Sequence, residues 1–199
     1  MSEKVYEIDL YLEKPDCVGE DSGDVVGFDC GYKRILVDSK RNEHDLGLEK
    51  IYEKISRKRQ GGKAFKRAIV ERDNLINQTI NQMEFADVSE VVVERLKSVK
   101  KNSRGKIRKE FNNKLQRWSY PKVLGKLLRV CEELGIKFTE VNPAYTSQTC
   151  SKCGSTHKES RNGVNFRCVE CGYAIDADYN AAINISRMGV YSPHAIKYH

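Results

Sequence analysis

The chain has 199 residues and a formal net charge of +7, enough for one medium-sized domain with a small additional module. No stretch reaches the about 18 apolar residues that a membrane span needs. The acidic N-terminus lacks the basic start and apolar run of a secretory signal. These features argue against a membrane or secreted protein, and we expect a cytoplasmic one. In a reducing compartment clustered cysteines are more often metal ligands than disulfides, and an odd count of seven fits no complete disulfide framework.

Positive charge is concentrated in two segments. Residues 54–72 hold eight Lys or Arg and one acid, and residues 95–130 hold thirteen and one acid. Half of all Asp and Glu lie in residues 1–53. Such segregation predicts a polyanionic partner, most simply nucleic acid, although a solvated basic helix face is the alternative. An anionic membrane is disfavoured because the basic segments lack a bulky apolar face.

We expect these basic residues to contact phosphates largely without regard to base sequence. The candidates are Arg57, Lys58, Arg59, Lys66, Arg67, Lys100, Lys101, Arg104, Lys106, Arg108 and Lys109. Trp118 is a candidate for stacking on a base. Its helical spacing with nearby leucines favours the core instead.

The N-terminal half begins with strand patterns and continues with helical ones. Residues 6–14 alternate as a strand that need not belong to the main sheet. Residues 25–31 form a short apolar strand containing Asp29, and residues 34–40 follow as its hairpin partner. Apolar residues recur with helical spacing over 48–55 and 65–83, and Gly61-Gly62 divides them into two helices or one broken arm.

The C-terminal half alternates strands with helices. Residues 88–96 predict a strand that delivers Glu94, and a basic loop follows. A helical pattern then runs from Leu115 to Leu134 and stops at Gly135. Residues 136–142 predict another strand, and a last helix covers about 178–188. This order predicts an α/β fold with a mixed sheet.

Two Cys-x-x-Cys pairs, fourteen residues apart, form the strongest local motif. The spacing lets two tight turns close a tetrahedral shell, which suits Zn²⁺. A glycine follows the second cysteine of each pair, as close backbone approach requires. Four thiolates leave no open coordination position, so we expect a structural zinc. Its ligands are Cys150, Cys153, Cys168 and Cys171. His157 is a spare candidate that fits a surface residue better, Cys30 and Cys131 suit the core, and Cys17 suits an exposed loop.

Three acids stand at the ends of predicted elements: Asp29, Glu94 and Asp178. Apolar strands that deliver carboxylates at their C-terminal ends build many α/β sites. Three converging carboxylates can hold two Mg²⁺ or Mn²⁺ ions for phosphodiester hydrolysis. An acid at a helix N-terminus is more often a cap, however, and either Asp176 or Asp178 can take that role.

Several longer pieces resemble the C-terminal half of TnpB (OrfB) transposon proteins, relatives of compact type V CRISPR effector nucleases. The resemblance covers about residues 20–188, and its last two pieces are highly specific. The pieces, in family order, are "VVGFDCGYKRILV", "ISRKRQGGKAFKR", "VVVERLKSV", "WSYPKVLGKLLRVCEELGIKFTEVNPAYTSQTCSKCG" and "CVECGYAIDADYNAAINI".

The resemblance implies a nuclease domain with an RNase H-like (RuvC-type) fold and a zinc ribbon inserted before the third acidic motif. By motif, Asp29, Glu94 and Asp178 are the catalytic acids, with Mg²⁺ or Mn²⁺ as cofactor. DNA is the implied substrate, and guide RNA is the implied partner of the full-length form. The expected organisation is a trailing strand over 1–20, the nuclease domain over 21–145, the zinc ribbon over 146–174 and the last motif with its helix over 175–199.

Family members usually carry a long N-terminal part that binds guide RNA and recognises target DNA, and only about 20 residues precede the nuclease motifs here. Two function classes therefore stay open. The first is a metal-dependent DNA endonuclease domain. The second is a nucleic-acid-binding zinc-ribbon fragment or transposition accessory protein that does not cleave on its own.

Overall fold

A computed structural model describes residues 23–32, 34–95, 119–191 and 196–198. The predicted strand over 6–14, Cys17, Trp118 and six of the candidate phosphate-binding residues lie outside the described residues. Those six are Lys100, Lys101, Arg104, Lys106, Arg108 and Lys109.

The core is a mixed sheet with the strand order β3-β2-β1-β4-β5-β9. Strands β1, β2 and β3 form an antiparallel meander, whereas β4 and β5 run parallel to β1. The strands are β1 (Asp24–Asp29), β2 (Leu36–Asp38), β3 (Glu43–His44), β4 (Val88–Glu94), β5 (Lys137–Val141) and β9 (Ile196–Tyr198). The predicted hairpin and mixed sheet are confirmed. The short strands β3 and β9 were not predicted.

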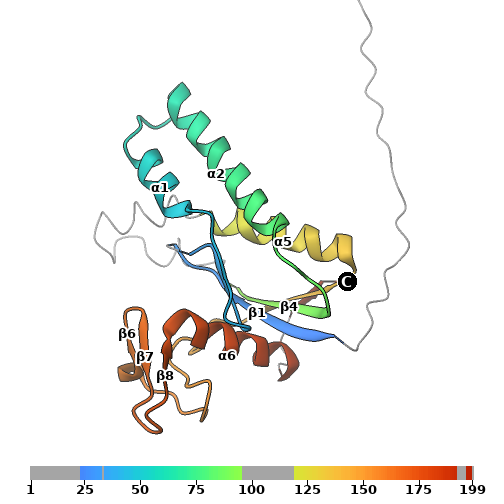
Figure 1. Ribbon diagram of the computed structural model, residues 1–199, viewed down its shortest axis with the longest axis vertical. Coiled ribbons are helices and arrows are strands. Elements are labelled where there is room, and N and C mark those ends of the chain that lie inside the picture. Colours follow the sequence, from blue (N-terminus) through green and yellow to red (C-terminus); the bar gives the residue numbers. More distant parts are fainter. Residues whose placement is uncertain (1–22, 33, 96–118, 192–195, 199) are drawn as a thin grey trace, which may run out of the picture.

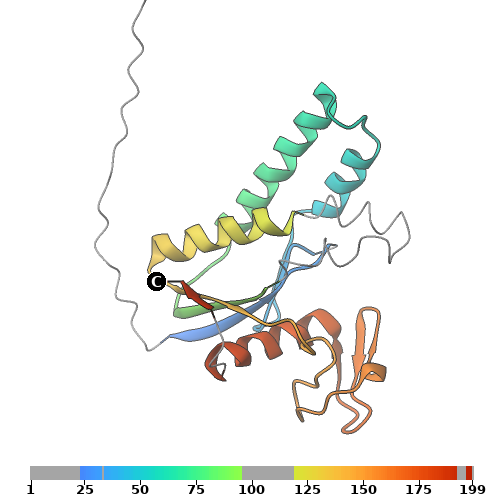
Figure 2. The ribbon, with the colours of Figure 1, turned by 180° about the vertical axis from the view of Figure 1, so that it is seen from behind.

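Three helices cover one face of the sheet, and one covers the other (Figures 1 and 2). The first three are α1 (Leu48–Ser56), α2 (Lys63–Asn81) and α5 (Tyr120–Leu134), and the last is α6 (Ala177–Tyr191). The turn at Gly61 and Gly62 separates α1 from α2 as predicted. Helix α5 ends where expected, because Gly135 adopts a left-handed φ of 71°.

The central strands are buried on both faces, with side chains divided by the strand period of two. Phe28, Val91 and Val93 pack with α1, α2 and α5 in the larger core. Val92 packs instead with Ile185 of α6 in a smaller cluster. The continuous apolar run of β4 therefore serves two separate cores.

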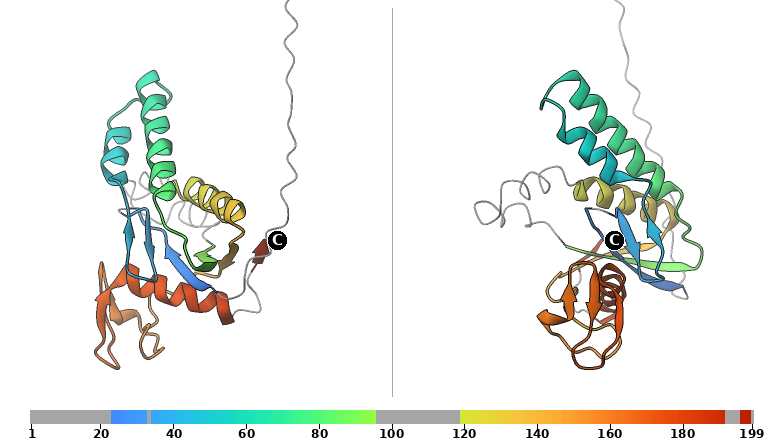
Figure 3. Two further views of the ribbon diagram at one scale, coloured as in Figure 1. Left: turned by 45° about the vertical axis from the view of Figure 1, so that its right-hand side comes forward. Right: turned by 60° about the vertical axis from the view of Figure 1, so that its left-hand side comes forward.

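A small antiparallel sheet lies at the N-terminal end of α6 (Figure 3). It consists of β6 (Arg161–Asn162), β7 (Asn165–Arg167) and β8 (Ala174–Asp176), with a 3₁₀ turn at Lys158–Ser160. The predicted ribbon boundary at residue 174 falls within β8, because that strand continues pairing with β7 up to Asp176. Among the described residues, no helix is long and apolar enough to cross a membrane.

Candidate functional site

Strand register brings Asp29 and Glu94 to the same edge of the sheet. They end the parallel neighbours β1 and β4, whose preceding residues Phe28 and Val93 are paired in register. Side chains alternate along a strand, so both carboxylates share the face of Val92, which packs against α6. Two acids far apart in the sequence are therefore delivered to one corner beneath α6.

Helix α6 reaches this corner because it lies unusually close to β1. A Cβ atom added to Gly27 would lie 2.3 Å from the Ser186 backbone nitrogen and 2.4 Å from the Ala182 carbonyl oxygen. Farther along the helix, a Cβ on Gly189 would lie 2.4 Å from a methyl carbon of Val92. The absence of side chains at both glycines lets the first turn of α6, with Asp178, sit over the ends of β1 and β4.

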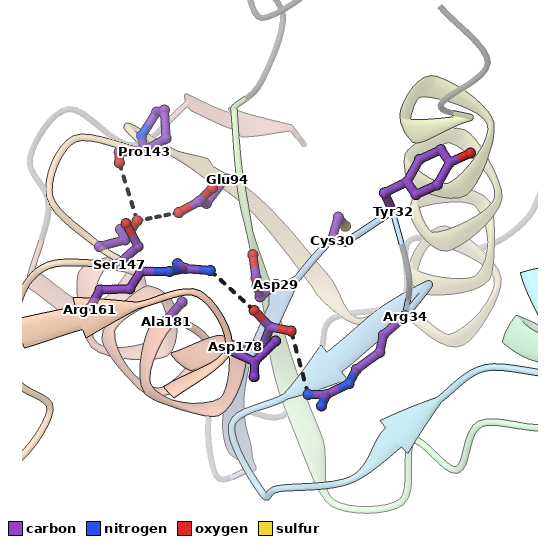
Figure 4. Close-up of a pocket in the computed structure, with 13 residues that line it drawn as sticks. Asp29, Cys30, Tyr32, Arg34, Glu94, Pro143, Ser147, Arg161, Asp178 and Ala181 are labelled. Atoms are coloured by element: carbon purple, nitrogen blue, oxygen red, sulfur yellow. Dashed lines mark hydrogen bonds and ion pairs between the residues drawn. The ribbon is translucent and has the colours of Figure 1, made fainter. Parts of the chain in front are cut away.

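The three acids line one cavity of about 390 Å³ (Figure 4). Two arginines from different segments, Arg34 and Arg161, line it as well. Asp29 comes from β1, Glu94 from β4 and Asp178 from α6, so the sequence-predicted trio is brought together.

Asp176, not Asp178, caps helix α6. One carboxylate oxygen of Asp176 accepts hydrogen bonds from the backbone N–H of Asp178 at 2.9 Å and of Tyr179 at 3.4 Å. These are the second and third helical residues, where an N-cap acts. The Asp178 carboxylate is therefore left to face the cavity.

Two arginines contact the acids at the start of α6. Arg34 donates two hydrogen bonds of 3.0 Å to Asp176, and its Nη1 lies 3.4 Å from Asp178 Oδ2. Arg161 Nη2 lies 3.4 Å from the other carboxylate oxygen, Asp178 Oδ1. Each oxygen of Asp178 therefore has one guanidinium partner.

Glu94 is held on both its side chain and its backbone. The Thr146 hydroxyl donates to the Glu94 carboxylate, and the Tyr120 hydroxyl donates to the Glu94 carbonyl. Thr146 is only 3% exposed and Glu94 is half-buried, so this contact is partly buried in the wall of the cavity. The orientation of Glu94 therefore depends on the segment that leads from β5 to the cysteines.

Electrostatics of the cavity favour added positive charge. Burial, with the nearby charges of Glu94 and Asp178, raises the pKa of Asp29 to about 8. Burial also raises the pKa of Glu94 and, together with Asp176, that of Asp178. Burial acts the same way on Asp176, but the hydrogen bonds and charge of Arg34, together with the backbone N–H groups of Asp178 and Tyr179, outweigh it and lower the pKa of Asp176. Carboxylate oxygens are the ligands that a hard divalent cation such as Mg²⁺ prefers. The three acids share one cavity, but among the described residues only the cysteines bring three or more ligand atoms within 4.8 Å of one another.

The four predicted cysteines form a second, separate cluster. Their sulfur atoms all lie within 4.8 Å of one another. The Sγ–Sγ distance is 3.7 Å between Cys150 and Cys171 and 3.6 Å between Cys153 and Cys168. A tetrahedron with zinc–sulfur bonds near 2.3 Å has edges of about 3.8 Å. The sulfur positions therefore fit a metal such as zinc.

Both cysteine turns have the same backbone design. The N–H of Gly154 donates to the Cys150 carbonyl at 2.9 Å, and that of Gly172 donates to the Cys168 carbonyl at 3.0 Å. Both glycines have a positive φ, 77° and 69°, which residues other than glycine rarely adopt. His157 is not a member of the cluster and pairs with Glu170 at 3.2 Å.

The described basic candidates lie at the junction of α1 and α2, away from α6 and the small sheet (Figure 1). We call residues 57–67 the basic tip. None of its five candidates lines the cavity, and all except the half-buried Lys58 are exposed. These five are Arg57, Lys58, Arg59, Lys66 and Arg67. Of the isolated cysteines, Cys30 and Cys131 are buried as predicted.

Sequence reasoning missed Arg34, Arg161 and Thr146 as partners of the acids. It also missed the buried residues Asn180 and Asn184 on α6. Arg34 lies in the quoted "GFDCGYKRILV" piece, so its closeness to Asp29 in the chain was a usable signal. Nothing local marks Arg161, which reaches Asp178 only through the folding of the small sheet.

Fold and site together define a mixed α/β protein with a carboxylate-lined cavity and a four-cysteine module whose sulfur positions fit a metal ion. A family model, "Cas12f1-like, TNB domain", matches residues 120–185. The chain belongs to the TnpB (OrfB) family, which includes TnpB-like transposon proteins, putative transposases and Cas12f CRISPR-associated nucleases.

Three relatives illustrate this membership. A "CRISPR-associated endodeoxyribonuclease Cas12f1" of Sulfoacidibacillus thermotolerans is 47% identical over 73 residues, 36% of this chain and 17% of the relative. A "TnpB-like protein" of Aquifex aeolicus is 35% identical over 106 residues, 51% of this chain and 34% of the relative. A "putative transposase" of Methanocaldococcus jannaschii is 37% identical over 75 residues, 34% of this chain and 69% of the relative.

A solved structure of a Cas12f1 protein resembles most of this chain. The protein in a cryo-EM structure of a Cas12f1–sgRNA–target DNA complex matches with a TM-score of 0.58 and 26% identity. The match covers 89% of this chain and 52% of that one. The matched part therefore spans about half of that protein, 17% of the first relative and about a third of the second.

Proposed function

We propose that this chain is the metal-dependent DNA endonuclease part of a TnpB-like, RNA-guided nuclease, with an RNase H-like (RuvC-type) fold. The observation that carries the proposal is the meeting of Asp29, Glu94 and Asp178 in one cavity. These acids come from three distant segments, and none of them is the helix cap. The endonuclease names of the relatives support the same class of reaction.

The proposed site is a carboxylate trio that hydrolyses DNA phosphodiesters. Two Mg²⁺ or Mn²⁺ ions bound there would activate the attacking water and stabilise the leaving oxygen. The residues of this chain supply oxygen ligands and fix their positions. Thr146 orients the Glu94 carboxylate, and Arg34 and Arg161 reduce the repulsion that Asp178 contributes.

The cysteine module is proposed to bind one structural Zn²⁺. All four ligands are thiolates, so the shell has no open position for a substrate or water. We propose that the ribbon extends over residues 146–176, with the nuclease domain on both sides of it, over 21–145 and from 177 onward. In this arrangement β8 of the ribbon leads directly into the helix that presents Asp178.

DNA and, in a longer form, guide RNA are the proposed partners. The complex named for the similar solved structure contains both kinds of nucleic acid. The exposed cations of the basic tip are suited to phosphate contacts that do not depend on base sequence. Because they lie apart from the cavity, they are proposed to bind the nucleic acid without taking part in cleavage.

One assay tests the proposed function directly. Labelled single- and double-stranded DNA is incubated with Mg²⁺ or Mn²⁺, with and without RNA co-purified from the host. The isosteric variants Asp29→Asn, Glu94→Gln and Asp178→Asn should each abolish cleavage and leave DNA binding nearly intact. Asp24→Ala is the matched control, because Asp24 lies on β1 with a side chain 61% exposed. A wild-type rate in any of the three variants would remove that residue from the site.

A binding module without cleavage is the second candidate, favoured by the separation of the basic tip from the acids. It would be established if the wild type binds DNA but never cleaves it, while a full-length relative cleaves under the same conditions.

A further inference from the structure

Helix α6 holds the segment that leads into the cysteine module. This segment, residues 146–151, is called the strap. The side-chain oxygen of buried Asn180 accepts a hydrogen bond from the backbone N–H of Ser151 at 2.9 Å, and its amide nitrogen donates one to the Thr149 carbonyl at 2.8 Å. Asn184 donates to the carbonyls of Thr146 and Thr149 at 2.9 and 2.7 Å. Two side chains of α6 therefore bind three backbone groups of the strap: the Thr146 and Thr149 carbonyls and the Ser151 N–H.

The strap is also part of the cysteine turn. Ser151 lies between Cys150 and Cys153 and is only 4% exposed. Its N–H is bound by Asn180, and its carbonyl accepts a hydrogen bond from Arg187 of the same helix. A shift of this turn would leave buried polar groups on α6 unpaired, which is costly. The position of the turn and the position of α6 are therefore linked by contacts as well as by chain continuity.

The other end of the strap reaches the carboxylate cavity. Thr146 donates its hydroxyl to Glu94, and its carbonyl is bound by Asn184. At the start of α6, the N–H of Ala177 donates to the Val164 carbonyl in the β6–β7 turn at 2.8 Å. The cysteine module thus contacts the elements that present Glu94 and Asp178.

We propose that Asn180, Asn184 and Thr146 are positioning residues that couple the cysteine metal centre to the carboxylate cavity, so that cations at the two sites bind cooperatively. This inference rests on the proposed role of the acids as a cation site. Zinc in the module holds the strap, the strap holds Glu94 and α6, and α6 holds Asp178. Coupling of this kind is reciprocal, so each metal must strengthen the other by the same factor.

The coupling is tested on the full chain without an activity readout. Mn²⁺ affinity is measured by electron paramagnetic resonance in zinc-loaded and zinc-depleted protein, and zinc affinity is measured by competition with a chromogenic chelator with and without Mn²⁺. We expect Mn²⁺ to bind at least about fivefold more tightly to the zinc-loaded protein, and zinc affinity to rise by the same factor when Mn²⁺ is present. Equal Mn²⁺ affinity in the two forms would overturn the coupling. If Mn²⁺ does not bind even to the zinc-loaded wild type, the proposed cation site itself fails.

Variants separate the contacts from chain continuity. In zinc-loaded protein, Thr146→Val should weaken Mn²⁺ binding while zinc stays bound, and Thr146→Ser, which keeps the hydroxyl, should restore it. Asn184→Ala should reduce the effect of zinc on Mn²⁺ affinity. Asn165→Ala, at an exposed site in the ribbon, is the control and should change neither affinity. If Thr146→Val retains wild-type Mn²⁺ affinity, or if the serine variant fails to restore it, Thr146 is not a positioning residue.

Tyr145, beside the strap, supports a second proposal by a different observation. It has a φ of 67°, a conformation that bulky residues rarely adopt, and the residue is 65% exposed to solvent. Its carbonyl accepts the N–H groups of Gln148 and Thr149, each at 2.9 Å, and the Thr149 hydroxyl at 2.9 Å. The backbone is therefore held in a strained form that presents an aromatic ring to solvent, and such strain is characteristic of functional sites.

We infer that the Tyr145 ring is a stacking platform for an unpaired nucleobase next to the scissile phosphate. Its neighbours Pro143 and Thr146 line the carboxylate cavity, and consecutive Cα atoms are about 3.8 Å apart. Tyr145 lies between these lining residues without lining the cavity itself, so its exposed ring is placed to meet a strand that extends beyond the acids. This inference also rests on the proposed function, and it specifies a single-stranded segment as the substrate at this position.

Binding of a single-stranded oligonucleotide containing 2-aminopurine tests the platform. It is measured with Ca²⁺ in the Glu94→Gln background, so that cleavage plays no part. Tyr145→Ala should weaken binding by ~5- to 150-fold, and Tyr145→Phe should retain it, because stacking needs the ring and not the hydroxyl. Val169→Ala, 54% exposed in the ribbon, is the control. Unchanged binding in the alanine variant, or equal loss in the phenylalanine variant, would overturn the inference whether or not the wild type cleaves DNA.

Discussion

Gly27→Ala is the sharpest single test of how the site is assembled. The new methyl group would lie 2.3 Å from the Ser186 nitrogen and 2.4 Å from the Ala182 oxygen, both backbone atoms of α6. Ordinary contact needs about 3.4 Å or more, so helix and strand must separate by roughly 1 Å. Overpacking of this kind costs about 1–3 kcal/mol of unfolding free energy.

The same displacement should damage the cavity. Asp178 moves with α6 while Asp29 stays on β1, so the carboxylates no longer share their ligand geometry. A misplacement of about 1 Å can lower activity about 100-fold. We therefore expect Gly27→Ala to lose stability in urea denaturation, and to lose both Mn²⁺ affinity and cleavage when folded.

Gly125→Ala provides the matched control. Gly125 lies within helix α5, and a Cβ there would meet no atom within 4 Å apart from the nearby backbone of its own helix. Alanine is the better helix former by about 1 kcal/mol, so this variant should be as stable as the wild type or more so. A Gly27→Ala protein that matches the Gly125→Ala protein in stability would refute the close-packing argument. Lost stability with normal Mn²⁺ affinity would refute the link between packing and the cavity.

Three further predictions concern the metals, the acids and the basic tip. Elemental analysis of protein purified without chelators should find one zinc per chain, and Cys168→Ser should lower both zinc content and Mn²⁺ affinity; protein without zinc would contradict the module's assignment. Because the pKa of Asp29 is raised to about 8 from 3.8, the protonated form is favoured in the metal-free fold. Without Mg²⁺, the free energy of unfolding of the wild type should therefore fall relative to that of Asp29→Asn as the pH rises from about 4 to 8. Added Mg²⁺ should remove this difference. If the stability of the two proteins changes with pH in the same way, the pKa of Asp29 is not raised in the folded protein. The double variant Lys66→Gln/Arg67→Gln should reduce the slope of log affinity against log salt by about 1.4 to 1.8 if both cations contact phosphate. An unchanged slope would place them outside the interface.

Local pattern determined the kinds of element. The apolar run before Asp29, the run before Glu94 and the helical spacing divided at Gly61 and Gly62 each predicted their element, because backbone propensity and side-chain period act over a few residues. The cysteine spacing likewise predicted a four-sulfur cluster from turn geometry alone. The short strands β3 and β9 escaped prediction because two or three residues show no period.

Which acid faces the cavity was decided by tertiary structure. The sequence left the capping of the last helix open between Asp176 and Asp178. The structure assigns it to Asp176, whose carboxylate meets the first turn of α6 and the Arg34 side chain. The link to Arg34 joins segments more than a hundred residues apart, beyond the reach of any local pattern.

The sequence by itself determined that two carboxylates end strands, that a third begins a helix and that four cysteines cluster. Tertiary structure decided that Asp29 and Glu94 share one face, through the parallel register of β1 and β4, and that α6 lies close enough to add Asp178. It also decided that Thr146, Asn180 and Asn184 join the cysteine module to those acids. The physical reason is that strand register, helix approach and buried hydrogen bonds depend on surfaces that exist only when distant segments pack together.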